Sequence, residues 1–115
     1  MNWPPPWVLE QQRKRAAVKA EFGPFFDDLV ALFYRCDPIA LAAIGAPADE
    51  YAPEVGTVLP RLSFVDGVEG VRTILQDEFT SWFGSQETDR PLAQNALDDL
   101  ASELWQAWTV YKGRH

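Results

Sequence analysis

The chain has little of what small catalytic or disulfide-bonded domains depend on. It contains one cysteine, Cys36, and one histidine, His115. A lone cysteine excludes an intramolecular disulfide, and the pair lacks the ligand spacing of a zinc site. The seven glycines stand apart from one another, so there is no glycine-rich phosphate-binding loop. We therefore assign no catalytic residue, metal ligand or cofactor from the sequence, and we expect a protein that is not an enzyme.

Long apolar runs are also missing. None approaches the roughly 18 residues that a membrane span needs. The N-terminal segment MNWPPPWVLEQQRKR lacks the charged-then-apolar order and the cleavage site of a secretory signal. The sequence predicts a soluble, cytoplasmic domain that keeps its cysteine reduced.

Basic residues are scarce in most of the chain. Between residues 20 and 111 there are 16 acidic residues and only four basic ones, namely Arg35, Arg61, Arg72 and Arg90. Such a surface repels phosphate backbones and anionic lipid, so we expect neither nucleic-acid nor membrane binding. It would attract a basic protein partner. The alternative is that the negative charge only keeps the domain soluble.

Apolar and aromatic residues, by contrast, are plentiful, at 47% and 13% of the chain. This composition predicts a folded protein, and the length suits one domain over residues 1–115. Proline and glycine divide it into segments with helical apolar spacing. We expect longer helices over 7–22, 24–36, 66–83 and 91–111, and short helices in IALAAI (39–44) and over 53–62. Residues 1–6 should form an extended proline-rich lead-in, and SQETD (85–89) a polar linker. The fold class is all-α: a single-domain bundle of four longer helices plus one or two short ones.

The acidic stretch around Tyr51 is the first candidate site. Asp49, Glu50 and Glu54 could ligate a hard cation, but alanines and prolines stand where a calcium loop needs further ligands. They could charge the entrance to a helix, whose N-terminus favours acids whatever the function. They could also dock a partner. Tyr51 either packs inward and anchors the loop or lies exposed as an interface anchor.

Other polar residues have simpler interpretations. Glu78 falls inside an apolar helical stripe and must reach the rim, pair with an arginine such as Arg35 or Arg61, or titrate with a raised pKa. We expect a structural ion pair. Cys36 is expected to pack as a small hydrophobic residue, and His115 to fray at the end of the chain.

The five tryptophans divide by their position in the apolar pattern. Trp82 and Trp108 lie on apolar stripes and are predicted to be in the core. Trp105 lies off its stripe and Trp3 lies in the proline-rich lead-in. These two are candidates for an exposed interface, or they cover each other if the N-terminus folds back across the last helix.

One part of the sequence resembles a known group of proteins. The segment DPIALAAIGAPADEYAPEVGTVLPRL looks like a family of small bacterial all-helical proteins of unknown function, found as short Bacillus proteins. The matching residues are Asp37, Pro38, Ile39, Asp49, Glu50, Tyr51, Val55, Val58 and Leu59, and the resemblance covers roughly residues 33–83. It implies an all-helical fold and no assigned activity. It transfers no catalytic residue.

These observations lead to three hypotheses. The first is a non-enzymatic protein-binding domain, such as an immunity or antitoxin protein, that binds a basic partner, for example a toxin. Its expected contact residues are Asp49, Glu50, Tyr51, Glu54 and Trp105. The second is a metal-binding or hydrolytic enzyme that uses Glu78 and the acidic loop. The third is a self-associating structural domain in which Trp3, Trp7 and Trp105 meet across a dimer axis. Both a monomer and a homodimer are compatible with the sequence.

Overall fold

Proline and glycine set the limits of the longer helices in the computed structural model, which describes residues 4–115. Helices α1 (Pro6–Phe22), α2 (Pro24–Cys36) and α6 (Pro91–Arg114) each carry a proline in the first turn. Proline is accepted there because the first N–H groups of a helix have no partner inside it. Helix α4 (Val68–Phe83) ends at Gly84, and α1 ends at Gly23. Both glycines have positive φ, at 84° and 58°, a conformation that costs glycine little.

Three short elements complete the chain. Helix α3 (Ala52–Val58) continues directly into the 3₁₀ helix η1 (Leu59–Phe64), and the change falls next to Pro60. Proline supplies no N–H for the α-helical ladder, which accounts for the change at this position. A single turn, α5 (Ser85–Thr88), links α4 to α6. No strand is present in the described part of the chain, and the predicted all-α fold with four longer helices is confirmed.

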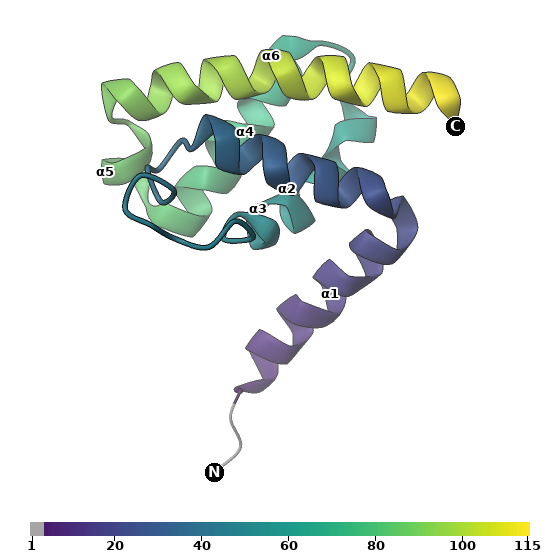
Figure 1. The fold of residues 1–115 in the computed structure, drawn as a ribbon, viewed down its shortest axis with the longest axis horizontal. Coiled ribbons are helices and arrows are strands. Elements are labelled where there is room, and N and C mark those ends of the chain that lie inside the picture. Colours follow the sequence, from purple (N-terminus) through teal and green to yellow (C-terminus); the bar gives the residue numbers. More distant parts are fainter. Residues whose placement is uncertain (1–3) are drawn as a thin grey trace.

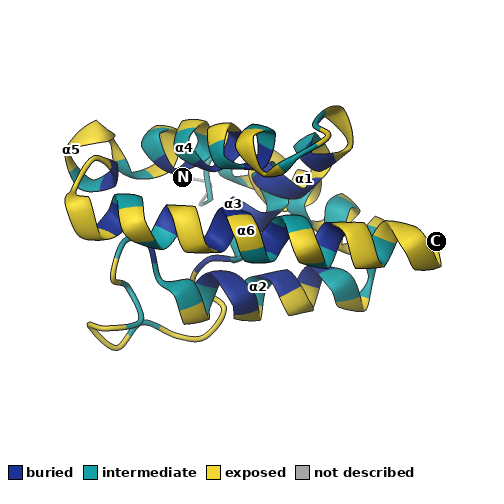
Figure 2. Cartoon of the chain, turned by 90° about the horizontal axis from the view of Figure 1, so that it is seen from above, coloured by how far each residue is buried: buried dark blue, intermediate teal, exposed yellow. Residues whose placement is uncertain are grey.

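Helices α2, α4 and α6 surround the core, and α3 closes it from below in Figure 1. Buried side chains lie on the faces of these helices that turn toward one another, as the dark segments of Figure 2 show. The largest fully buried apolar side chains include Phe33, Phe79, Leu97, Leu104 and Val55. Their burial is the main favourable term for a domain of this size.

Helix α1 lies outside this core. It has no buried residue and extends from the body at an angle (Figure 1). It contacts α3 at Gly56, where an added Cβ would lie 3.2 Å from Cγ of Arg15.

Two local predictions are wrong. IALAAI forms a series of turns and no helix, and Ile44 is 79% exposed. Six residues barely exceed the length of a costly helix nucleus, and side-chain bonds from Asp37 to the backbone favour the turns. The predicted linker SQETD contains α5, in which the hydroxyl of Thr88 is buried and donates to the carbonyl of Gly84 at 2.9 Å.

Trp82 also departs from its prediction, whereas Trp108 agrees with it. Trp108 is buried, but Trp82 is 38% exposed and donates its indole N–H to Oγ1 of Thr57 at 3.2 Å. Trp82 lies in the last turn of α4, where α1 diverges and leaves an open groove beside it. An apolar stripe does not reveal where its covering element ends.

Candidate functional site: the acidic loop and its support

The loop between α2 and α3 is organised by Asp37. This residue ends α2 in the left-handed conformation, with φ of 52°. Its carboxylate accepts N–H bonds from Ala42 at 2.9 Å and from Ala43 at 3.0 Å. It also accepts the hydroxyl of Tyr51 at 2.7 Å. One side chain therefore connects the beginning, the middle and the end of the loop.

Tyr51 packs inward, the first of the two alternatives for this residue. Its side chain is fully buried, with its ring centroid 6.0 Å from that of Phe79. Its hydroxyl accepts the N–H of Ile39 at 3.2 Å and donates to Asp37. Burial, together with the hydrogen bond to Asp37, raises the pKa of Tyr51 well above its usual value. Tyr51 thus supports the loop and is not available as an exposed contact residue.

A second tyrosine supports the same loop. The hydroxyl of Tyr34, on α2, donates to the backbone carbonyl of Ala46 at 2.8 Å. Turn hydrogen bonds run from Ala46 N–H to the Leu41 carbonyl and from Glu50 N–H to the Pro47 carbonyl, both at 3.0 Å. The loop is therefore tied to the core at several points although it contains no regular helix.

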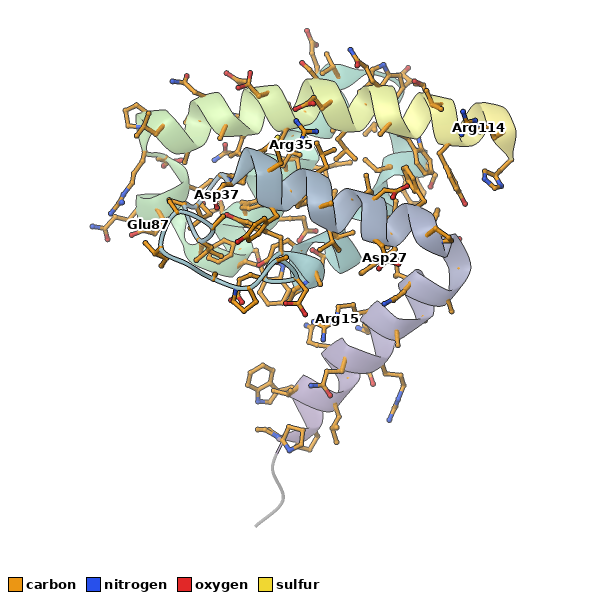
Figure 3. The ribbon with its side chains drawn as sticks, in the orientation of Figure 1. Arg15, Asp27, Arg35, Asp37, Glu87 and Arg114 are labelled. Atoms are coloured by element: carbon orange, nitrogen blue, oxygen red, sulfur yellow. The ribbon has the colours of Figure 1, made fainter. Side chains whose placement is uncertain are left out.

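Asp49 and Glu50 are both exposed at the end of this loop. They line a groove of about 530 Å³ whose other wall carries Arg15 and Lys19 of α1. Lys19 pairs with Asp27 of α2 at 3.5 Å, whereas Asp49 and Glu50 have no ion-pair partner among residues 4–115. Figure 3 shows Arg15 on the side of α1 that faces the body. No predicted site contained Arg15 or Lys19, although their i, i+4 spacing places them on one face of the helix.

Glu54 is not part of the exposed acidic surface, which corrects the prediction. Its side chain is 4% exposed, and its Oε2 has no hydrogen-bond partner in the described structure. Desolvation raises the pKa of this carboxyl to about 7; Glu50 raises it further and Arg15 opposes the shift. Glu54 is the third acid of the cluster. It is buried because the start of α3 turns toward the core the face that also carries the buried Tyr51 and Val55.

Trp105 belongs to a different part of the molecule. It is half-buried on α6 and packs against the rim of the core. Helix α6 runs along the upper side of the body in Figure 1, and the acidic loop lies below α2. The five predicted contact residues therefore do not form one surface: Asp49 and Glu50 are together and exposed, Tyr51 and Glu54 are buried beside them, and Trp105 lies elsewhere. Trp3 lies outside the described residues.

The four arginines between residues 20 and 111 are all engaged by acids of the same part of the chain. The half-buried carboxylate of Glu78 forms an ion pair with Arg61 at 3.2 Å, in agreement with the predicted structural pairing. Asp77 lies 3.5 Å from the same arginine. The other three arginines of the body are likewise paired: Arg35 with Glu103, Arg72 with Asp98, and Arg90 with Glu87. The acids outnumber these arginines, so acids such as Asp49 and Glu50 keep no ion-pair partner among the described residues.

Cys36 and His115, the single cysteine and the single histidine of the chain, make separate contacts. The thiol of Cys36 donates to Oε2 of Glu103 at 3.4 Å. Burial, and then this hydrogen bond, raises the pKa of the thiol to about 11, so it stays protonated at neutral pH. His115 stacks on Tyr111 at a centroid distance of 4.3 Å, in the last turn region of α6. Within the described residues no three His, Cys, Asp or Glu side chains gather as a metal site would require.

The comparisons with known proteins return no match: no protein-family model, no curated protein and no solved structure is similar enough to support an inference. The resemblance to the small bacterial proteins therefore stays a prediction. None of the helices in residues 4–115 combines the length and the apolar character needed to cross a bilayer.

Proposed function

We propose that this chain is a non-enzymatic protein-binding domain whose acidic loop contacts a basic partner. The observation that carries the proposal is the charge balance of the body. The four arginines between residues 20 and 111 are paired internally, and Asp49 and Glu50 remain exposed without an ion pair in the described residues. An immunity or antitoxin role toward a basic toxin in the cytoplasm is the most concrete form of this function.

The support beneath the loop favours recognition. A loop that is already ordered in the free protein loses little conformational entropy when it binds. Asp37 and Tyr51 provide that order from inside, and they leave the two acids at the surface. Charge complementarity of this kind acts chiefly on the rate of association and on the choice of partner.

Two groups that an enzyme could use, Glu78 and Cys36, make structural contacts. Glu78 is held by Arg61, and the Cys36 thiol is held protonated by burial and by Glu103. A general acid or nucleophile needs a matched pKa and a second polar group facing it. These contacts support the binding role over the hydrolytic alternative.

The test begins with affinity capture from cells that naturally contain the chain, followed by binding kinetics with the identified partner. The variant Asp49→Ala/Glu50→Ala should lower the association rate about tenfold at low salt and flatten its salt dependence, with little change in the dissociation rate. The matched control Asp66→Ala/Asp99→Ala removes two other exposed acids that have no ion pair in the described structure. Equal association rates for the two double variants would refute the assignment of this loop.

A further inference from the structure

The groove beside Trp82 is separate from the acidic loop. It opens where α1 diverges from α3, η1 and the end of α4 (Figure 1), and it has a volume of about 520 Å³. Small-molecule sites in proteins are clefts of roughly 300–1,000 Å³ with mostly apolar walls and a few polar groups that orient the ligand. The volume of this groove falls within that range.

The walls of the groove are largely apolar. They include Val18 of α1, Pro53 of α3, Pro60 of η1 and Trp82 of α4. Trp82 donates its indole N–H to Oγ1 of Thr57 at 3.2 Å, which holds the ring in place although the residue is 38% exposed. An exposed indole ring offers a flat apolar surface on which another ring can stack.

Gly56 lets α1 approach α3 closely at this groove. A Cβ at Gly56 would lie 3.2 Å from Cγ and 3.4 Å from Cβ of Arg15, so the aliphatic stem of Arg15 packs on the bare backbone of α3. A long cationic side chain that packs through its stem keeps its charged end accessible. Figure 3 shows Arg15 on the side of α1 that faces the body, where it borders both this groove and the groove of Asp49 and Glu50.

The charge of the lining distinguishes this groove from the rest of the surface. Lys14, Arg15 and Arg61 line it together with one carboxylate, Glu78, which is already paired with Arg61 at 3.2 Å. Neither Lys14 nor Arg15 has an ion-pair partner among residues 4–115. In four other grooves of the described residues, lysines and arginines do not outnumber the acids. A protein of net charge −7 thus has a groove with an excess of positive charge.

The apolar wall and the unpaired cations together favour an anion with a flat apolar body. A neutral apolar molecule would stack on Trp82 but leave Lys14 and Arg15 without a counter-charge. A polyanion such as a nucleic acid would be repelled by the acidic body around the groove. A single carboxylate on an aromatic ring system avoids both costs, because charge-assisted hydrogen bonds from guanidinium and ammonium groups hold the carboxylate while the ring covers the wall.

We infer that this groove binds a small aromatic carboxylate, with the ring against Trp82 and the carboxylate held by Lys14 and Arg15. The site uses neither Asp49 nor Glu50. It therefore goes beyond the function proposed above and does not depend on it.

Titration of the full, isotope-labelled chain with naphthoate, followed by NMR, tests the site. The indole N–H of Trp82 and the backbone N–H groups of Gly56 and Thr57 should shift together and saturate. The corresponding naphthamide has the same ring system and no charge. It should bind at least about tenfold more weakly, because it lacks the charge-assisted contacts.

Two double variants with the same change in net charge locate the anion. Lys14→Gln/Arg15→Gln should weaken naphthoate binding about tenfold and leave naphthamide binding unchanged. The matched control Arg13→Gln/Lys19→Gln removes the same two residue types from α1 at positions that do not line the groove, and it should leave naphthoate binding close to that of the wild type. Trp82→Ala should weaken the binding of both probes. Circular dichroism verifies that each variant stays helical.

Several results would overturn the inference. One is naphthoate that shifts no signal of the groove up to its solubility limit. Another is a set of shifts confined to the end of α6 around Val110, which would place the probe in the groove between α2 and α6. A third is naphthamide that binds as tightly as naphthoate. Equal losses in the two double variants would also overturn it, because the overall charge of α1 would then hold the anion.

Discussion

The hydroxyl of Tyr51 donates a 2.7 Å hydrogen bond to the carboxylate of Asp37, 14 residues earlier in the chain. The tyrosine is fully buried, and the same carboxylate holds the backbone of Ala42 and Ala43. The two residues thus determine the conformation of the loop that presents Asp49 and Glu50. A buried polar pair of this kind stabilises a structure only when its partners are all present.

Tyr51→Phe tests this pair most directly. The substitution removes the hydroxyl and leaves the shape of the ring, so the N–H of Ile39 loses its acceptor and Asp37 loses a donor. We expect the free energy of unfolding to fall by about 1–3 kcal/mol, as measured by urea denaturation. Tyr34→Phe removes the half-buried bond to Ala46 and should cost less. A Tyr51→Phe protein as stable as the wild type would contradict the role given to this bond.

Cys36 should react slowly in the folded protein. With a pKa of about 11 against 9.0 for an ordinary thiol, its thiolate fraction near pH 8 is about a hundredfold lower. Iodoacetamide should therefore alkylate the native thiol about a hundredfold more slowly than the urea-unfolded chain, as followed by mass spectrometry.

Glu103→Gln separates the two causes of this slow reaction. It removes the negative charge beside the thiol and replaces the carboxylate acceptor with a weaker amide oxygen, so the native alkylation rate should rise. Asp99→Asn, which lies nearby and makes a smaller contribution to the same pKa, should raise the rate less. If Glu103→Gln leaves the rate unchanged, burial alone protects the thiol.

Gly70 and Gly113 form a matched pair that tests how closely α4 packs against the segment before it. A Cβ added at Gly70 would lie 2.7 Å from Cβ and Cγ1 of Val65, whereas one at Gly113 would meet nothing within 4 Å. Gly70→Ala should destabilise the protein by about 1–3 kcal/mol despite the higher helix propensity of alanine. Gly113→Ala should be neutral or stabilising by up to about 1 kcal/mol. Thermal or urea unfolding measures both, and a stabilising Gly70→Ala would show that Val65 moves aside freely.

Features that depend on neighbouring residues in the chain could be predicted from the sequence. Proline and glycine act on the backbone where they stand, so the limits of α1, α2, α4 and α6 were predicted to within a few residues. A structural ion pair for Glu78, with Arg35 or Arg61 as the named candidates, was also predicted, because a carboxylate in an apolar stripe needs a cation; Arg61 is the partner.

Features that depend on distant elements could not be predicted in this way. Trp82 was expected to be buried and is partly exposed, whereas Glu54 was expected to be exposed and is buried. The direction in which α1 leaves the body determines the exposure of Trp82, and the rotation of α3 against the core determines the burial of Glu54. Helical spacing along one segment contains no information on either. The bond from Tyr51 to Asp37 likewise joins two residues whose approach requires the finished loop.

Glu54 makes the stability of the protein depend on pH, and the sign follows from its raised pKa. The unfolded carboxyl ionises near its ordinary value of 4.5 and the folded one near 7. The unfolded state therefore releases its proton first, and the stability contributed at low pH is lost between about pH 4.5 and pH 7. A shift of this size corresponds to about 3 kcal/mol.

Glu54→Gln cannot ionise, so its free energy of unfolding relative to the wild type should rise by about that amount across this window and level off above it. Urea denaturation at several pH values measures the difference. Glu21→Gln, which removes a carboxylate from an exposed position on α1, is the control for the change in net charge. A Glu54→Gln curve parallel to the wild type would mean that water reaches this carboxylate in the folded protein.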